Sequence, residues 1–273
     1  MEFTSLLNYL SAENVSVAHD YSKKTLLRIA RTKDNNEAEK ILTKLTSVDL
    51  SSFPEAKQQI LDSAFFKFLT NIKELNIDYQ KVSNLDDIFL FHGLRKLSMK
   101  GHLLLNISFI APFSQLEELN LDDNQIVILH GIEHLMNLKV LSLKKNKIRK
   151  IDEISELKNL QELNISENDI NDISNLKTNI NLKRLFANKN LIENIDVIEK
   201  LKALTQLQLA ENQIQTIDSL QYLMNLSKLD LRKNRIKNVK CLKDLKSLFE
   251  LGLSGNPLYD DDLDIFPRSL RID

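Results

Sequence analysis

The segment 138–160, LKVLSLKKNKIRKIDEISELKNL, contains the pattern that decides the fold of this chain. Its apolar residues and one asparagine follow the order L-x-x-L-x-L-x-x-N-x-I-x-x-I-x-x-L-x-x-L. The pattern starts nine times with a constant 22-residue period, at Ile72, Leu94, Leu116, Leu138, Leu160, Leu182, Leu204, Leu226 and Leu248. A period of this size is typical of a solenoid, in which one repeat cannot bury its apolar face alone. We therefore expect the function to depend on a surface rather than on a deep pocket.

The composition is that of a globular chain without a general attraction to polyanions. Hydrophobic residues make up 42% of the 273 residues and charged residues 27%, which excludes a disordered chain. The formal net charge is -1, so we expect no binding of nucleic acid. No apolar run reaches the length needed for membrane insertion.

Two features bear on the cellular compartment. Cys241 is the only cysteine, which rules out an internal disulfide and favours a reducing compartment. The segment 1–14, MEFTSLLNYLSAEN, has no basic residue before its apolar stretch, which argues against a cleavable signal peptide. We expect a cytoplasmic monomer, or a protein exported to a host cytosol without such a peptide.

Residues 1–70 do not follow the repeat, and we expect them to form four short helices. These helices are expected in the stretches 3–10, 17–31, 38–45 and 54–69. The sequence DNN at 34–36 supplies a start signal for the third helix, and Pro54 suits the first turn of the fourth. Because the end of a solenoid exposes its core, we expect the phenylalanine-rich fourth helix to cover the first repeat.

Within each repeat, the L-x-x-L-x-L segment predicts a short strand. Successive strands are expected to stack about 4.8 Å apart as one parallel sheet. The asparagine after each strand can bond backbone groups that the sheet leaves unpaired, each of which costs about 1–3 kcal/mol when buried alone. These asparagines are Asn124, Asn146, Asn168, Asn190, Asn212, Asn234 and Asn256. The first two repeats carry Gln80 and His102 instead, and we expect the least regular ladder there.

The repeats resemble those of leucine-rich repeat proteins of the 22-residue subclass, which includes the regulatory subunit of protein phosphatase 1 and the bacterial internalins. The match covers residues 72–258, and the ending from Asn256 to Asp273 resembles a shortened C-terminal cap of that subclass. An internalin-like protein would also carry a secretion signal and an immunoglobulin-like C-terminal cap, and the sequence shows neither.

The resemblance implies an α/β solenoid: a curved leucine-rich repeat array with one parallel sheet on the concave side and an α-helical N-terminal cap. It divides the chain into a helical cap at 1–70, nine repeats at 71–258 and a short C-terminal cap at 259–273. The segment 267–273 is expected to form a final short strand.

In this family, the residues between the inward leucines form the concave binding face. On that face even-numbered repeats are basic and odd-numbered repeats are acidic, as in the series Asp123, Lys145, Glu167, Lys189, Glu211 and Lys233. We infer that the array grew by duplication of a 44-residue pair of repeats. Opposite charges on neighbouring strands contribute about 0.2–1 kcal/mol per pair, which is a structural explanation. The functional alternative is a charge-striped surface complementary to a partner.

Phe186 departs from the asparagine, serine or glutamine that most other repeats carry at its position. An aromatic residue in the middle of the concave face, flanked by Arg184, is typical of an interface anchor. Alternatively, the ring tilts inward to fill the space left by Ala187, which replaces the usual leucine or isoleucine. The residues expected to contact a protein partner are Phe186, Arg184, Val140, Lys144, Glu162, Gln208, Arg232 and Asp122.

The sequence gives little indication of catalysis. His130, Glu133 and His134 match the H-x-x-E-H spacing of a zinc site, but Gly131 disfavours the regular helix that such a site needs. Cys241 has no neighbouring histidine, and the five glycines form no phosphate-binding loop. We expect no enzyme activity, no metal and no cofactor.

The main functional hypothesis is a scaffold or adaptor that binds a protein partner on its concave face. One alternative is a regulatory subunit of an enzyme such as a phosphatase. Another is a bacterial effector exported into a host cell to bind a host protein. A further alternative assigns residues 1–70 to a catalytic or ligase-recruiting domain, although His19 is their only histidine and they lack cysteine.

Overall fold

The computed structural model describes residues 3–13, 15–51, 60–82, 84–259, 263–267 and 269–273. Two compact units make up the chain. The first unit comprises Met1–His102 with Gln115–Asn120, and the second comprises Leu103–Ser114 with Leu121–Asp273.

Three α-helices open the first unit: α1 (Leu6–Ser11), α2 (Val17–Ala30) and α3 (Asn35–Leu42). Each helix follows a residue whose side chain accepts a hydrogen bond from a backbone amide of the first turn, namely Ser5, Ser16 and Asp34. These helices confirm the first three predictions, including the start signal at 34–36.

The prediction of a fourth helix is wrong where the structure describes it, at residues 60–69. Instead, β2 (Ile60–Leu61) pairs in parallel with β4 (Lys81–Val82), and the 3-10 helix η2 (Ser63–Phe68) follows. Asp62 starts η2 because its Oδ1 accepts a hydrogen bond from the backbone amide of Ala64 at 3.0 Å. Helical spacing over so few residues suits a 3-10 turn as well as an α-helix. The predicted helix start at Pro54 lies outside the described residues.

The strand ladder also begins earlier than the repeat count suggests. β1 (Ser47–Asp49) pairs in parallel with β3 (Glu74–Asn76), so the expectation that residues 1–70 are helical is wrong here too. Leu45, Val48 and Leu50 fit L-x-x-L-x-L, but the step from Leu45 to Ile72 is longer than the constant step of the later repeats. A search at that constant step therefore misses this strand.

Parallel strands continue through both units. In the first unit the order is β1, β3, β5 (Lys96–Ser98) and β6 (Glu118–Asn120). The second unit contains β7 (Val140–Ser142), β8 (Glu162–Asn164), β9 (Arg184–Phe186), β10 (Gln206–Gln208), β11 (Lys228–Asp230), β12 (Glu250–Gly252) and β13 (Arg271–Ile272). β13 pairs with β12 and confirms the expected final strand.

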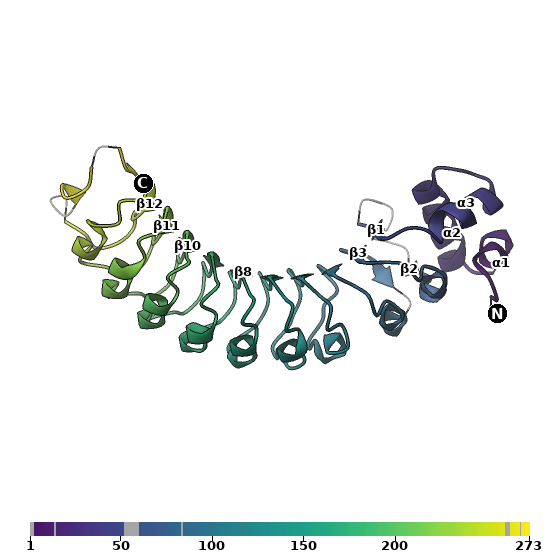
Figure 1. Cartoon of the computed structure of the whole chain (residues 1–273), viewed down its shortest axis with the longest axis horizontal. Coiled ribbons are helices and arrows are strands. Elements are labelled where there is room, and N and C mark those ends of the chain that lie inside the picture. Colours follow the sequence, from purple (N-terminus) through teal and green to yellow (C-terminus); the bar gives the residue numbers. More distant parts are fainter. Residues whose placement is uncertain (1–2, 14, 52–59, 83, 260–262, 268) are drawn as a thin grey trace. The chain divides into compact units, whose positions relative to one another are not determined.

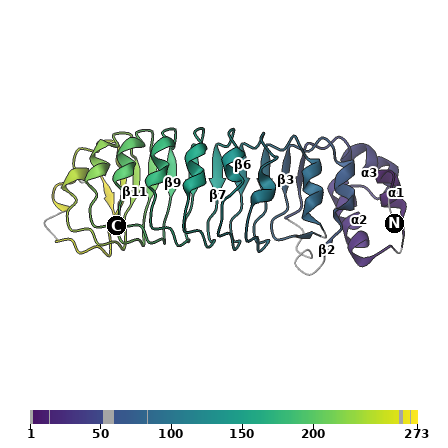
Figure 2. The same cartoon turned by 90° about the horizontal axis from the view of Figure 1, so that it is seen from below.

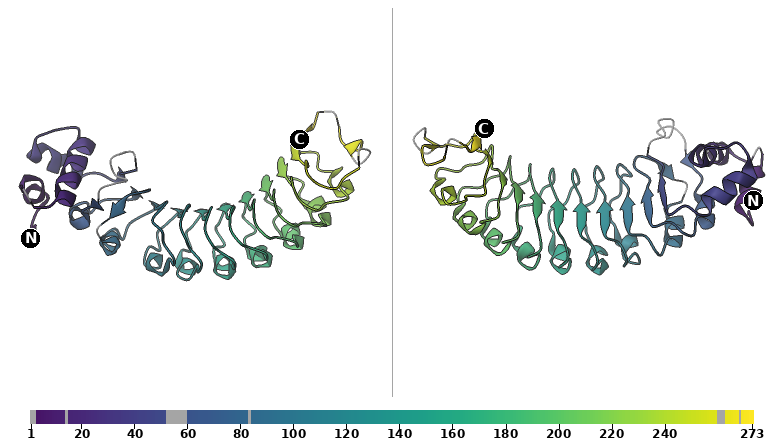
Figure 3. Two further views of the ribbon diagram at one scale, coloured as in Figure 1. Left: turned by 180° about the vertical axis from the view of Figure 1, so that it is seen from behind. Right: turned by 45° about the horizontal axis from the view of Figure 1, so that its top comes forward.

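The second unit has two layers. Its strands line the inner side of the arc in Figure 1, and 3-10 helices line the outer side. Corresponding elements of successive repeats lie side by side in Figures 2 and 3. The 3-10 helices of the repeats are η3 (Leu85–Leu90) in the first unit and η4 (Ser108–Ile110), η5 (Ile132–His134), η6 (Asp152–Glu156), η7 (Ser174–Thr178), η8 (Asp196–Lys200), η9 (Asp218–Tyr222) and η10 (Lys240–Leu242) in the second. The inward leucines and isoleucines between the layers are buried.

The asparagine after each strand of the second unit performs the predicted role. Asn190 Nδ2 donates to the carbonyl oxygens of Ile165, Ala187 and Asn188 at 2.9, 3.2 and 3.3 Å. Its Oδ1 accepts from the backbone amide of Ile170 at 3.0 Å. The same set of bonds recurs at Asn146, Asn168, Asn212 and Asn234. One side chain thus joins two repeats and closes the turn after its own strand.

His102 takes this position in the first unit. Its Nε2 lies 2.7 Å from the carbonyl oxygen of Ile77, the equivalent of the Ile165 acceptor, and donates a hydrogen bond to it in the neutral tautomer protonated at Nε2. Burial is the main cause that lowers the pKa of His102. The backbone departs from the other repeats at Leu103, whose φ is 58°, whereas the positive φ of Gly101 recurs at the same position in other repeats, as at Asp123.

Candidate protein-binding surface

The outward residues of β7 to β12 form the concave face of the second unit. Strand register places Val140, Glu162 and Arg184 in one row across the sheet. Phe186 lies in a second row, with Asn164 and Gln208 as its neighbours.

A third row lies two residues further along each repeat. Asp122, Lys144 and Arg232 occupy it, and Arg232 lies five repeats after Asp122. At the spacing of a parallel sheet, five steps correspond to roughly 24 Å. The fold therefore places the predicted contact residues on one extended face rather than in one compact cluster.

Many charged residues of this face are paired with each other. Arg184 forms an ion pair with Glu162, and Lys144 Nζ lies 3.2 Å from Glu167 Oε1. Further pairs join neighbouring repeats at Lys145 and Asp123, Lys228 and Glu250, and Lys233 and Glu211. The expectation that opposite charges on neighbouring strands lie side by side is confirmed. Because the cation of each pair is exposed, each pair contributes little to stability.

Asp122 also has a structural role. Its Oδ1 accepts hydrogen bonds from the Ser142 hydroxyl at 2.5 Å and from the Lys144 amide at 2.8 Å. Asp78 of the first unit makes the same two bonds, two repeats earlier, with Ser98 and Lys100. This recurrence supports the inferred duplication of a pair of repeats.

Phe186 is the aromatic residue at the centre of the concave face. Its side chain is half-buried and lines a concavity of about 290 Å³, to which Asn164, Gln208 and Lys144 also contribute. Ala187, the next residue, is fully buried. The surroundings of the ring are mainly polar, so Phe186 is the large apolar group that this concavity offers.

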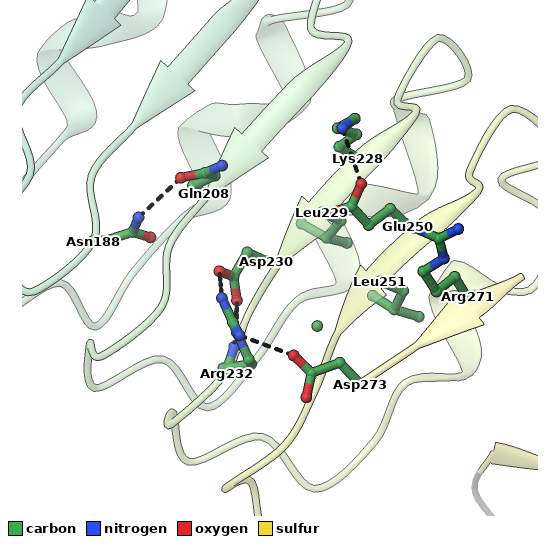
Figure 4. Close-up of a pocket in the computed structure, with 11 residues that line it drawn as sticks. Asn188, Gln208, Lys228, Leu229, Asp230, Arg232, Glu250, Leu251, Arg271 and Asp273 are labelled. Carbon is green, nitrogen blue, oxygen red and sulfur yellow. Dashed lines mark hydrogen bonds and ion pairs between the residues drawn. The ribbon is translucent and has the colours of Figure 1, made fainter.

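A second concavity, of about 300 Å³, lies at the C-terminal end of the face (Figure 4). Arg232 donates to both carboxylate oxygens of Asp230, at 2.9 and 2.7 Å, and to Asp273 Oδ2 at 2.8 Å. The hydrogen bonds and charge of Asp230 raise the pKa of Arg232 above its ordinary value. Arg232 is thus held by two carboxylates, one of them beyond the last repeat.

Gly252 makes room for this network. A Cβ atom at Gly252 would come within 2.8 Å of Asp230 Oδ1 and 3.2 Å of Arg232 Nε. The repeat pattern does not predict the roles of Gly252, Arg271 and Asp273, which line the second concavity with Arg232. One signal was present, because Gly252 stands in a position where the preceding repeats all carry a side chain.

A comparison of the sequence with protein-family models identifies the type of repeat. The model described as Leucine Rich repeats (2 copies) matches residues 136–178 and 180–222. The chain therefore contains leucine-rich repeats. No curated protein matches the sequence.

Solved structures share the fold. An internalin (inlF) from Listeria monocytogenes is similar with a TM-score of 0.72 and 20% identity, over 96% of this chain and 87% of the internalin. Internalin C2 (inlC2) from the same organism has a TM-score of 0.72 and 22% identity, over 85% and 99% of the two chains. The ectodomain of the plant receptor kinase GASSHO1/SCHENGEN3 from Arabidopsis thaliana, solved in complex with Casparian strip integrity factor 2, has a TM-score of 0.61 and 22% identity, over 81% and 28%.

The other residues that the sequence analysis considers for chemistry lie in the outer layer of the second unit. Cys241 donates from Sγ to the carbonyl oxygen of Ile217 at 3.3 Å, and burial raises the pKa of its thiol to about 11. Such a thiol is a poor nucleophile at neutral pH.

Glu133 lies between the two histidines of the H-x-x-E-H segment. Its Oε1 is 2.9 Å from His130 Nδ1 and 3.7 Å from His134 Nε2. Among the residues that the structure describes, no group of three or more histidine, cysteine or acidic side chains is arranged to hold a metal ion. In the same residues, no helix combines the length and apolar character needed to cross a membrane.

Proposed function

We propose that this leucine-rich repeat protein is a non-catalytic binding module that holds a protein partner on its concave face. The observation that carries the proposal is Phe186, a half-buried aromatic ring in a concavity of about 290 Å³ on a face where many charges pair with each other. Large apolar anchors in such positions account for much of the binding energy at interfaces.

The arrangement of charges supports a protein partner over a small molecule. Paired charges on a broad face fix the orientation of a partner more than they raise its affinity. The plant receptor ectodomain of the same fold is solved in complex with a factor, which agrees with a binding role for such arrays.

The test compares wild-type protein with the double variant Phe186→Glu, Arg184→Glu. Each is immobilised and exposed to cytosolic extract, and retained proteins are identified by mass spectrometry. The matched control is Tyr222→Glu, Arg235→Glu, which also replaces an aromatic residue and an arginine with glutamate, but away from the concave face. We expect a protein that wild type and the control retain and the Phe186 variant loses.

Thermal unfolding of each variant separates binding from folding. If the Phe186 variant unfolds at a much lower temperature, the ring fills the core and the proposal is wrong. Identical retained proteins for all three would also contradict it. A retained phosphatase catalytic subunit would narrow the function to a regulatory subunit, and a retained host protein would narrow it to an effector.

A further inference from the structure

One flank of the second unit, outside the concave face, carries exposed apolar residues in neighbouring repeats. The apolar flank patch consists of Leu103, Leu105, Val127 and Ile128. These side chains are between 46% and 68% exposed. Single exposed apolar residues are common, but contiguous apolar patches on a protein surface mark interaction sites.

The backbone brings the members of the patch together. The Val127 amide donates to the carbonyl oxygen of Leu105 at 3.1 Å, and Asn106 and Ile128 form a parallel bridge. Leu105 and Val127 occupy equivalent positions in successive repeats, so their side chains stand about 5 Å apart, as in a parallel ladder. The patch is therefore a continuous surface of two repeats.

The fold does not require apolar residues at these positions. Later repeats place polar residues at the position shared by Leu105 and Val127, namely Arg149, Asn171, Glu193, Gln215 and Lys237. The later equivalents of Ile128 are also polar, namely Lys150, Asp172, Asn194, Thr216 and Asn238. The apolar flank patch is a local departure from the pattern of the array.

The next repeat places positive charge beside the patch. The basic band consists of the exposed residues Lys147, Arg149 and Lys150. Lys147 Nζ donates to Gln125 Oε1 at 3.2 Å, and Arg149 Nε is 3.9 Å from Asp169 Oδ2. The Arg149 contact is a weak pair because both side chains are more than half exposed. The flank therefore changes from apolar to basic within one repeat.

We propose that the apolar flank patch and the basic band dock a segment of a partner protein in which apolar residues are followed by acidic ones. The apolar residues of that segment cover the patch, and its carboxylates pair with the basic band, where arginine can bind a carboxylate through two hydrogen bonds. The backbone amides of Gln125, Val127 and Lys147 already donate within the unit. Recognition therefore depends on side chains and not on the addition of a strand.

The charges beyond the basic band favour a protein segment over an anionic membrane. Asp169 and Asp172 are exposed in the repeat that follows the band. A broad anionic membrane surface would face these carboxylates as well as the cations. A segment that ends at the band avoids them.

The test selects ligands from a phage library of short random peptides on immobilised wild-type protein. Selected peptides are then measured on two variants: Leu105→Asn with Val127→Asn, and Arg149→Glu with Lys150→Glu. The array already carries asparagine at the position shared by Leu105 and Val127, namely Asn171. The matched controls are Leu191→Asn and the pair Arg235→Glu, Lys237→Glu. Vesicles of phosphatidylserine are tested in parallel, and thermal unfolding confirms that each variant folds.

We expect selected peptides that combine apolar and acidic residues and bind both test variants about tenfold or more weakly, as expected when anchors of an interface are lost. Both controls should bind as wild type does. The proposal is overturned if no such peptide is selected, if the peptides bind the test variants as well as wild type, or if only the vesicles bind through the patch. If the Phe186→Glu, Arg184→Glu variant binds the selected peptides as wild type does, the peptide-binding surface is distinct from the concave face.

Discussion

In the two units, different side chains donate a hydrogen bond to the equivalent backbone carbonyl oxygen. In the second unit Asn190 donates to the carbonyl oxygen of Ile165 in the preceding repeat, and in the first unit His102 donates to the equivalent carbonyl. The repeat therefore requires a hydrogen-bond donor at this position rather than asparagine itself. The difference also shows what asparagine adds, because an amide does not titrate in the physiological range and an imidazole does.

The largest expected effect comes from breaking the regular ladder. Asn190→Ala leaves the amide of Ile170 without its side-chain acceptor. The carbonyl oxygens of Ile165 and Ala187 each lose one of two asparagine donors and keep the other, from Asn168 and Asn212. One unsatisfied buried group costs about 1–3 kcal/mol and each weakened carbonyl adds less, so we expect a total loss of about 2–4 kcal/mol. Urea unfolding measures it.

Asn181→Ala is the matched control for this prediction. Asn181 is exposed and donates to the carbonyl oxygen of Lys158 at 2.9 Å. Its removal should cost less than about 1 kcal/mol, since water replaces the lost partner. Equal losses of unfolding free energy for Asn190→Ala and Asn181→Ala would mean that the hydrogen bonds of the buried asparagines do not stabilise the array.

A smaller effect should appear at His102 as a dependence on pH. The pKa of His102 is lowered in the folded chain from the ordinary value of 6.5, mainly by burial. The unfolded chain therefore binds the proton first as the pH falls. The contribution of neutral His102 to the free energy of unfolding is fully present above about pH 6.5. It is lost as the pH drops from there towards the pKa of His102 in the folded chain.

His102→Asn should remove this part of the acid sensitivity, because asparagine can donate to the Ile77 carbonyl without titrating. Unfolding of wild type and variant is measured between neutral and mildly acidic pH. The informative quantity is the difference between the two curves, since other histidines are common to both proteins. Parallel curves would show that His102 does not titrate on unfolding.

The smallest expected effect concerns the charge pairs that both units share. Lys145 Nζ lies 2.9 Å from Asp123 Oδ1, and both side chains are well exposed. Lys145→Ala should cost a few tenths of a kcal/mol, and high salt should reduce the difference. Lys145→Glu should cost more, because it places a third acidic residue between Asp123 and Glu167. A loss that does not change with salt would indicate packing of the lysine stem instead.

The sequence predicts most of the fold because the repeat links pattern to register. A constant step between repeats fixes which leucines pair, and therefore which charges face each other, as at Lys145 and Asp123. The same rule misses β1, because a longer repeat separates Leu45 from Ile72. Short apolar stretches are also ambiguous in type, which is why the sequence predicts an α-helix over 54–69 where the structure has β2 and η2 instead.

Part of the candidate surface was predictable and part was not. The position of Phe186 on the concave face follows from its place in the repeat. The network of Arg232 with Asp273 depends on how the chain returns after the last repeat, where no period applies. The apolar flank patch does not follow from the sequence alone, because the exposure of its four residues is a property of the structure.

The alternation of basic and acidic repeats constrains how the array can change length. Deleting residues 160–203 would remove two repeats and set Lys145 beside Glu211, so opposite charges would still meet at the new junction. Deleting residues 160–181 would remove one repeat and set Lys145 beside Lys189. Insertions and deletions within this array are therefore best tolerated as pairs of repeats, and natural length variants should differ by whole pairs.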